Sequence, residues 1–289
     1  MHDNLTKNQS YIDLHIHSTC SDGLLSPAQI IQIAGERGLK AISITDHDTV
    51  AATVTASQLG QEAGIEVVPG IEIGVAYADC EVHLLGYYID AQSEGLKEYA
   101  GLLMASREER ARAIVKALQK QGMDIPYELV KQKADGAPIG RPHIAHVLVE
   151  EGYVFSSYEA FQKYLGENKA GDIPKLNIGL ERAVQLVKEA KGLAFLAHPA
   201  TIECCQDVLD LLIEYGLDGI ETIHPKQAGT QQSYYREMAR QYHLLESGGS
   251  DCHGGRDGNI AIGTLDVPIS FLHEMKKRLF EKQTTNVHE

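Results

Sequence analysis

The sequence predicts an α/β fold in which strands and helices alternate, as in a parallel barrel or a doubly wound sheet. Three observations support this prediction: apolar runs of strand length recur along the chain, helical patterns separate most of them, and most runs end at or near a His, Asp or Glu. The runs rich in Ile, Val and Leu lie at about 11–16, 40–45, 65–72, 81–89, 193–197, 218–223 and 243–247.

The predicted helices follow their strands in order. Ser26 and Pro27 favour the start of a helix that we expect to reach Arg37, because Ser caps helices and Pro is tolerated in the first turn. Thr49 is expected to open a second helix that ends near Ala63. Further helical patterns cover about 179–190, 203–215 and 227–241.

One connection departs from this alternation. Only about four residues separate the run that ends near Tyr77 from the run that begins at Glu81, whereas a parallel crossover needs about a dozen or more. These two strands are therefore expected to form an antiparallel hairpin. The hairpin would bring His83, near the start of its strand, to the same end of the sheet as Glu72.

A helical insertion is predicted at 91–176, which leaves 1–90 and 177–289 to form the barrel. Successive helical patterns replace the alternation there, and breaks rich in Gly, Pro and Asp separate them. The insertion could be a bundle that only fills space or a cap over the barrel mouth. We favour a cap, because of the residues that the segment 140–145 places in this insertion.

Composition limits the class of protein. The chain is 43% hydrophobic and 23% charged, which is typical of a globular protein, and it contains no apolar run of the roughly 18 residues that a membrane helix needs. Its polar N-terminus does not resemble a signal peptide, so we expect a cytoplasmic protein without a membrane partner. A net charge of −14 disfavours duplex DNA as a partner. Five irregularly spaced cysteines argue against a disulfide framework.

Potential metal ligands follow the predicted strands. Because the strands of an α/β barrel deliver their C-terminal ends to one working face, residues far apart in sequence can converge there. His83 would join them through the hairpin. The candidates after the strands are His15, His17, Asp46, His47, Glu72, His198, Glu221, His224, Asp251 and His253.

Local spacing supports chelation. His15 and His17 would point to the same side of an extended segment, although a single His-x-His is more often a core or surface feature. In the segment TDHD (45–48), Asp46 and His47 follow an apolar strand, although Asp48 or Thr49 could be the N-cap of the next helix. Imidazole and carboxylate ligands without thiolate favour Zn²⁺, Mn²⁺ or Fe²⁺, and their number implies more than one ion. The cysteines beside these positions, Cys20, Cys80 and Cys252, are expected to be small buried fillers.

Six segments resemble the successive motifs of the PHP family, the polymerase and histidinol phosphatase superfamily. They are HIHSTCSDG (15–23), ITDHDT (44–49), PGIE (69–72), EVHLLGY (81–87), AHP (197–199) and SGGSDCHG (247–254). The resemblance implies a distorted (β/α)₇ barrel with a trinuclear site, and we expect two or three divalent ions to bind. It assigns one ion to His15, His17, Glu72 and Asp251, a second to Asp22, His47 and His198, and a third to Glu72, His83 and His253.

The insertion contributes a further resemblance. Its GRPHIA segment (140–145) is similar to that of the branch acting on nucleotides, which includes nucleoside 3′,5′-bisphosphate phosphatases and a 5′→3′ exoribonuclease. Arg141 and His143, beside a Pro in the first helical turn, could hold a phosphate, which favours the cap. The alternative is an Arg that pairs with a surface carboxylate. His224 could bind substrate or move a proton.

The expected activity is hydrolysis of a phosphate monoester on a small nucleotide, such as a nucleoside 3′,5′-bisphosphate, by a hydroxide that bridges two ions. The expected catalytic residues are His198, His224 and Asp251. The runner-up is 5′→3′ cleavage of short RNA oligonucleotides. A metal-dependent amidohydrolase could use a similar barrel, and a non-catalytic metal-binding module is the remaining possibility.

Overall fold

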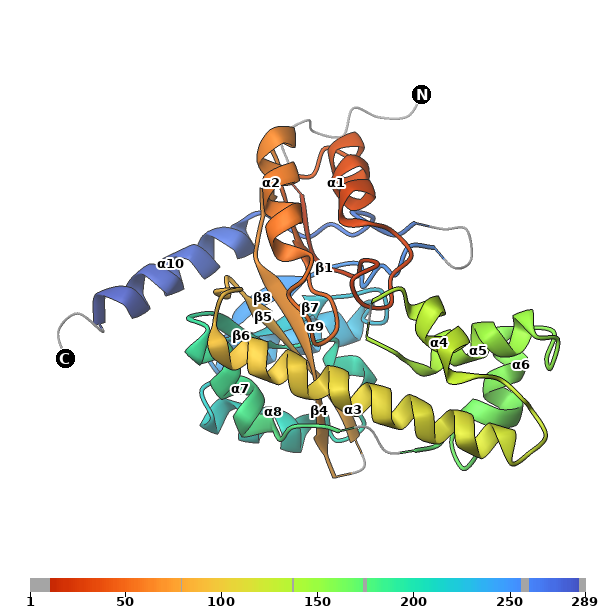
Figure 1. The fold of residues 1–289 in the computed structure, drawn as a ribbon. Helices are drawn as coiled ribbons and strands as arrows, with labels where there is room; N and C mark the ends of the chain where they lie inside the picture. Colours follow the sequence, from red (N-terminus) through yellow and green to blue (C-terminus); the bar gives the residue numbers. More distant parts are fainter. Residues whose placement is uncertain (1–10, 79, 137, 174–175, 256–259, 286–289) are drawn as a thin grey trace. The chain divides into compact units, whose positions relative to one another are not determined.

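The computed structural model of the protein describes residues 11–78, 80–136, 138–173, 176–255 and 260–285. The chain divides into two compact units, one made of residues 1–96 and 178–289 and the other of residues 97–177. Across the described residues, no helix is both long and apolar enough to cross a membrane. The first unit is an α/β fold, as the sequence predicts, and the second is helical (Figure 1).

The strands of the α/β unit form two sheets. The first sheet is parallel and contains β1 (Ile12–Ile16), β2 (Ala41–Ile44) and β3 (Glu66–Val67). The second has the order β4 (Gly70–Tyr77), β5 (Cys80–Tyr87), β6 (Leu193–Leu196), β7 (Gly219–Ile223) and β8 (Leu245–Gly248). In this second sheet β5 runs antiparallel to both of its neighbours, and β6, β7 and β8 run parallel to one another.

Strand pairing among the described residues does not close a continuous barrel. Isolated parallel bridges link the two sheets, between His47 and Glu72 and between Ile16 and Cys252. In each bridge one residue, His47 or Cys252, lies in a loop that follows a strand and carries candidate ligands, where regular ladder bonding has ended. One buried cluster nevertheless takes side chains from both sheets, including Leu14 and Phe195, so the sheets enclose a common core.

Pro69 explains the largest difference from the predicted strands. The single run expected at 65–72 is two strands, because proline lacks the N–H that a ladder bond requires. β3 therefore ends before it, and β4 begins after it in the other sheet. Glu72 consequently lies near the start of β4 and not near the end of a strand.

The antiparallel hairpin is confirmed. β4 and β5 pair along their whole length, with Glu72 opposite Leu85 and Gly74 opposite His83. Residues directly opposite each other in an antiparallel pair share a face, as do residues two apart in one strand. Glu72 and His83 therefore lie on the same face, diagonally across the pair, and the intervening Gly74 leaves room for the imidazole.

The helices of the α/β unit begin and end close to the expected positions, with two exceptions. They are α1 (Pro27–Glu36), α2 (Thr53–Ala63), α7 (Leu180–Glu189), α8 (Cys205–Glu214), α9 (Thr230–Gln241) and α10 (Ser270–Thr285). Ser26 caps α1 through a capping box with Gln29. The expected cap of α2 at Asp48 or Thr49 is wrong, because that helix starts four residues later at Thr53. The sequence prediction missed α10.

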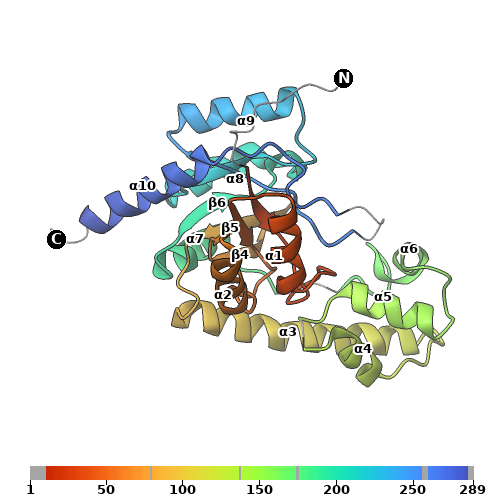
Figure 2. The same ribbon diagram turned by 90° about the horizontal axis from the view of Figure 1, so that it is seen from above.

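These helices pack against the sheets and against one another. α1 and α2 lie side by side (Figures 1 and 2). α7 packs against β4, β5 and β6, and α9 packs against β7 and β8. Buried residues of α7, among them Val184 and Val187, supply its apolar face. The strands that these helices flank are almost fully buried, and such strands are usually apolar throughout. The polar residues at or near their ends are therefore unusual, and they mark a site.

The helical unit has a core of its own. It contains all but the first turn of α3 (Glu94–Gln119), together with α4 (Tyr127–Ala134), α5 (Arg141–Glu150), α6 (Ser157–Ala160) and a short π-helix, η1 (Phe161–Leu165). Its buried cluster includes Ile114, Leu118, Ile144 and Leu148. The helical patterns of the sequence at about 91–121, 142–151 and 157–166 correspond to α3, α5 and α6 with η1, whereas α4 was not predicted.

Candidate metal centre

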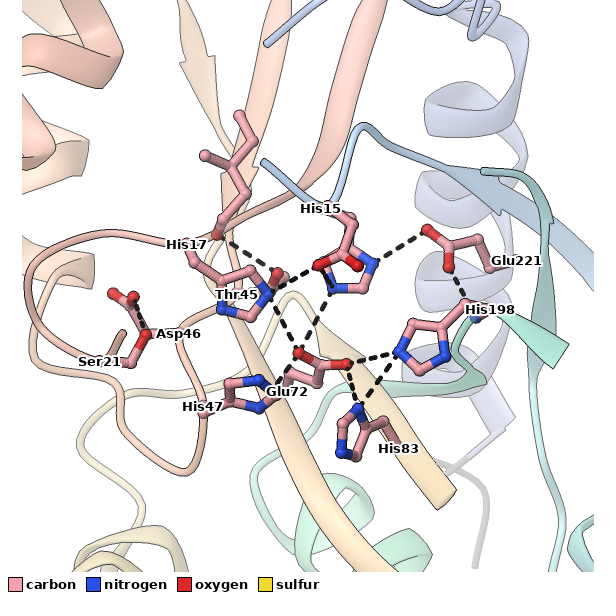
Figure 3. A network of polar contacts seen from close by, with 12 residues as sticks. His15, His17, Ser21, Thr45, Asp46, His47, Glu72, His83, His198 and Glu221 are labelled. Carbon is pink, nitrogen blue, oxygen red and sulfur yellow. Dashed lines mark hydrogen bonds and ion pairs between the residues drawn. The ribbon is translucent and has the colours of Figure 1, made fainter. Parts of the chain in front are cut away.

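Glu72 is the centre of a cluster of imidazoles (Figure 3). It is almost completely buried, and its two carboxylate oxygens face different histidines. Oε2 lies 3.4 Å from His15 Nε2, 3.1 Å from His17 Nε2 and 3.2 Å from His47 Nδ1. Oε1 lies 2.9 Å from His83 Nδ1 and 3.0 Å from His198 Nε2. One carboxylate therefore joins five imidazoles that come from β1, β5 and the loops after β1, β2 and β6.

Asp251 closes the Oε2 side of the cluster. Its Oδ1 lies 3.5 Å from His15 Nε2 and 3.2 Å from His17 Nε2, while its Oδ2 lies 3.3 Å from His224 Nε2. The loop after β8 is fixed to β1 by backbone bonds, since the Asp251 N–H donates to the His15 carbonyl at 2.8 Å. The His17 N–H in turn donates to the Cys252 carbonyl at 3.0 Å.

A third group lies around Asp22. Its Oδ1 is 3.4 Å from His253 Nε2 and 3.7 Å from His17 Nδ1. The rings of His17 and His253 are stacked with centroids 4.1 Å apart. His47 joins this group, because one ligand atom from each of His17, Asp22, His47 and His253 can be chosen within 4.8 Å of the others.

The distances group some ligands differently from the division that the resemblance implies. His253 lies with Asp22, His17 and His47 and is not grouped with Glu72 and His83. His198 lies 3.2 Å from His83 and 3.0 Å from Glu72, on the Oε1 side of that carboxylate. All nine expected ligands converge, and their division among individual ions stays a prediction.

Burial and charge shift the pKa values of these groups in opposite directions. Burial lowers the pKa of His17, but the nearby carboxylates of Asp251 and Glu72 overcome this effect and raise the pKa to about 10. For His83, burial is likewise opposed by Glu72, which raises the pKa to about 9. Burial dominates at His47 and lowers its pKa to about 4. Burial raises the pKa of Glu72, but His47, His83 and His15 outweigh it and hold the pKa well below its usual value.

The donor set fits divalent metal ions. Four buried polar atoms that face the centre lack a hydrogen-bond partner within the described parts of the chain: His15 Nε2, both ring nitrogens of His17 and Glu72 Oε2. Buried polar atoms are normally satisfied, so such a concentration indicates that they bind something else. Imidazole nitrogens and carboxylate oxygens suit Zn²⁺, Mn²⁺ or Fe²⁺. Ions and protons compete for these nitrogens, because only neutral imidazole binds a metal.

Three buried carboxylates support the site. Asp46, named above as a candidate ligand, instead accepts bonds from the Ser18 N–H at 2.7 Å and from the Ser18 and Ser21 hydroxyls at 2.6 Å. It thereby holds the loop that carries Asp22. Asp13 accepts from the Ser250 N–H, next to Asp251. Glu221 contacts His15 and His198. Asp13 and Glu221 lie within largely apolar strands, a sequence signal that does not distinguish a ligand from a supporting group.

The expected phosphate-binding residues belong to the helical unit. Arg141 opens α5, and its guanidinium donates to the Leu165 carbonyl at 3.0 Å rather than to a surface carboxylate. His143 accepts a bond from the Gly140 N–H on Nδ1, in the manner of a capping box. His143 thus supports the start of α5, and Arg141 connects that helix to the end of η1. The contact of both residues with a phosphate stays a prediction.

His224 contacts the cluster through Asp251. Its Nδ1 accepts a bond from the Lys226 N–H at 3.2 Å, which leaves the ring proton on Nε2, where it faces Asp251 Oδ2. Both ring nitrogens are therefore engaged by the protein. This arrangement suits a residue that orients Asp251.

One expectation about the cysteines is wrong. Cys80, at the start of β5, forms a disulfide with Cys204, just before α8. The two cysteines are separated by 124 residues, so their spacing gave no sign of the pairing. Cys252 is buried, in agreement with its expected role as a filler, and Cys20 is half-buried.

Comparison with known proteins agrees with this geometry. Residues 13–167 match the family model described as the PHP domain. The chain belongs to the PHP family. The expected class, a metal-dependent hydrolase of phosphate esters, is thereby confirmed at the level of the family.

Several relatives of this PHP protein carry named activities. A 5′-3′ exoribonuclease, Rnm of Salmonella typhimurium, is 32% identical over 83% of this chain and 84% of its own. A phosphoribosyl 1,2-cyclic phosphate 1,2-diphosphodiesterase of Eggerthella lenta is 33% identical over 84% of this chain and 94% of its own. A 3′,5′-nucleoside bisphosphate phosphatase of Chromobacterium violaceum is 30% identical over 89% of this chain and 92% of its own.

Solved structures show the same fold. A metal-dependent phosphoesterase structure from Bifidobacterium adolescentis has a TM-score of 0.83, is 28% identical, and aligns over 94% of this chain and 96% of its own. A structure from Chromobacterium violaceum described as an amidohydrolase with bound sulfate has a TM-score of 0.81 and is 28% identical, with 92% and 96% coverage.

Proposed function

We propose that this PHP protein hydrolyses a phosphate monoester of a small nucleotide, with a nucleoside 3′,5′-bisphosphate as the first substrate to test. The observation that carries the proposal is the Glu72 carboxylate, which faces five imidazoles through two different oxygens. A single catalytic zinc needs only three protein ligands, so this number supports two or three ions. Zn²⁺, Mn²⁺ and Fe²⁺ all fit the ligands.

The residues would divide their tasks as follows. Ions bound here activate water and neutralise phosphoryl oxygens. His15, His17, Glu72 and Asp251 form one set of ligands, with the second oxygen of Asp251 held by His224. His198 Nε2 lies close to the other oxygen of Glu72, and its Nδ1 forms a hydrogen bond with the Thr201 hydroxyl, 3.0 Å away. His198 and His224 remain the proposed groups for proton transfer to the leaving alcohol.

We further propose that the helical unit contributes Arg141 and His143 to the substrate phosphate, which is the role of a cap. An arginine fork matches phosphate oxygens, and the backbone N–H groups at the start of a helix favour an anion. We also propose that the α/β unit is a distorted (β/α)₇ barrel. This proposal is supported by the common core of the two sheets and by the bridges between them.

The substrate test compares two products. The protein is incubated with Mn²⁺ and either adenosine 3′,5′-bisphosphate or a short 5′-phosphorylated oligoribonucleotide. Release of inorganic phosphate from the bisphosphate supports the proposed phosphatase. Stepwise release of mononucleotides from the oligonucleotide, with the bisphosphate left intact, would replace it with the exoribonuclease. The similar identity of the two kinds of relative, 32% and 30%, keeps that second candidate.

Arg141 gives a separate test of substrate binding. Hydrogen bonds to a charged group contribute about 1.5–3 kcal/mol, so Arg141→Ala should lower kcat/KM by about 10- to 100-fold. Arg141→Lys should restore only part of this loss, because lysine lacks the fork. Arg182→Ala is the control, since Arg182 is an exposed residue of α7 that pairs with Glu189. Equal kcat/KM for Arg141→Ala and the wild type would remove Arg141 from the substrate site.

A further inference from the structure

Glu221 is a buried carboxylate that belongs to none of the proposed ligand sets. It lies on β7, has no exposed surface, and its two oxygens are directed to different neighbours (Figure 3). Oε1 is 3.0 Å from His15 Nδ1, and Oε2 accepts a bond from the His198 N–H at 2.7 Å. A buried carboxylate is costly unless its oxygens are bonded, and here both bonds go to candidate metal ligands.

The first bond determines which nitrogen of His15 faces the centre. An ionised carboxylate only accepts hydrogen bonds, so the proton of the neutral imidazole must sit on Nδ1. Nε2 then has a lone pair, and it points to Glu72 Oε2 at 3.4 Å and to Asp251 Oδ1 at 3.5 Å. Glu221 thus fixes both the tautomer and the direction of the ring.

The second bond fixes the backbone at His198. This residue has φ 26° and ψ 58°, a backbone conformation that residues other than glycine seldom adopt. Its N–H is held by Glu221 Oε2, and its Nε2 lies 3.0 Å from Glu72 Oε1. The two ligands that Glu221 holds therefore contact opposite oxygens of Glu72.

We propose that Glu221 is a positioning residue that sets the metal affinity of the centre by orienting His15 and His198 together. The proposal rests on the proposed metal centre, but it concerns a residue that would contact no ion. Carboxylates that receive the second N–H of a ligating histidine raise the affinity of the metal in other sites. Here one carboxylate does so for His15, and it also holds the backbone N–H of His198, a candidate ligand from another part of the chain.

The test is the affinity for Zn²⁺, measured by competition with a chromophoric chelator and without any substrate. Glu221→Gln keeps the size of the side chain, but its single carbonyl oxygen can accept only one of the two bonds well, and its NH₂ group can accept neither. Loss of such a partner costs about 10- to 100-fold in metal affinity, which is the expected result. At saturating metal, KM for the phosphate ester should remain that of the wild type.

Two further variants separate positioning from stability. Glu246→Gln on the adjacent strand β8 removes a carboxylate that bonds Thr222 and Arg236, and its Zn²⁺ affinity should equal that of the wild type. Glu221→Asp retains the charge with a shorter reach and should also bind Zn²⁺ more weakly. It supplies the comparison if the glutamine variant does not fold, which circular dichroism of the metal-free proteins reports.

Unchanged Zn²⁺ affinity in a folded Glu221 variant overturns the proposal. A lower melting temperature of the metal-free variant with unchanged affinity does so as well, because it assigns Glu221 a structural role only. Failure of the wild type to bind Zn²⁺ is a different outcome, since it overturns the proposed metal centre and this inference with it.

Discussion

Two candidate ligands are held in backbone conformations that most residues avoid. His198 and Asp251 have φ values of 26° and 50°. Left-handed or otherwise rare conformations cost on the order of 1–3 kcal/mol each and persist where surrounding bonds enforce them. The Asp251 N–H bonds the His15 carbonyl, and the His198 N–H bonds Glu221, so both conformations are fixed by neighbouring strands. This strain is placed where a precise ligand direction is needed.

His83 should belong to a separable part of the metal centre. It contacts Oε1 of Glu72, whereas His15, His17 and His47 contact Oε2. We therefore expect His83→Ala to lose one bound ion per chain and to retain the ion held by the Oε2 side. Metal content, measured by plasma mass spectrometry after removal of free ions, checks this expectation.

The matched control for His83 is His273→Ala, which changes an exposed histidine on α10. Its metal content should equal that of the wild type. Loss of all ions from His83→Ala would contradict the division of the cluster into two sides of Glu72. An unchanged metal content would remove His83 from the ligands.

At the scale of elements, small residues let the strands approach closely enough to join the ligands. A side chain at Gly249 would place its Cβ 2.3 Å from the His15 N and 2.4 Å from the His15 Cβ. The loop after β8 therefore contacts β1 at His15, one of the candidate ligands. The small residues of the Gly-Gly-Ser segment (248–250) permit this close approach to β1.

Gly249→Ala should therefore damage both stability and metal binding. Overpacking of this kind costs about 1–3 kcal/mol, because β1 must move away from the loop. The displacement would separate His15 from Asp251 and weaken Zn²⁺ affinity. Urea unfolding and chelator competition measure the two effects. Gly179→Ala is the control, because nothing lies within 4 Å of a Cβ at that position.

If Gly249→Ala unfolds at the same urea concentration as the wild type, the close approach is absent in solution. If it is destabilised but binds Zn²⁺ normally, the contact supports β1 without setting the geometry of the ligands.

How far the elements could be predicted depended on local patterns. The short link between Tyr77 and Glu81 predicted the hairpin, since no crossover fits there. Pro69 could have predicted the break between β3 and β4, and buried Leu272 and Met275 on α10 repeat at helical spacing. The disulfide and the role of Glu221 had no local signal. Each depends on segments that meet only in the folded protein.

For the whole molecule, metal binding is expected to stabilise the α/β unit, because that unit holds the ligands. All nine proposed ligands lie within residues 1–96 and 178–289, and the helical unit has a separate core. They are His15, His17, Asp22, His47, Glu72, His83, His198, Asp251 and His253. With 40 acidic and 26 basic residues, the chain carries an excess of negative charge that bound cations would reduce.

Removal of metal should therefore loosen the α/β unit selectively. An ion present at about 100 times its Kd stabilises the folded state by about 2.7 kcal/mol, which corresponds to about a 100-fold change in the opening equilibrium. After chelation, we expect amide hydrogen exchange to accelerate in β1 and in the loops after β2, β6 and β8. Peptides from the core of α3 and α5 should change far less, because they contain no ligand.

Added Zn²⁺ or Mn²⁺ should restore protection, whereas Mg²⁺ should restore less because it binds imidazole poorly. Equal exchange of the ligand-bearing segments before and after chelation would mean that the cluster does not hold ions that stabilise the fold.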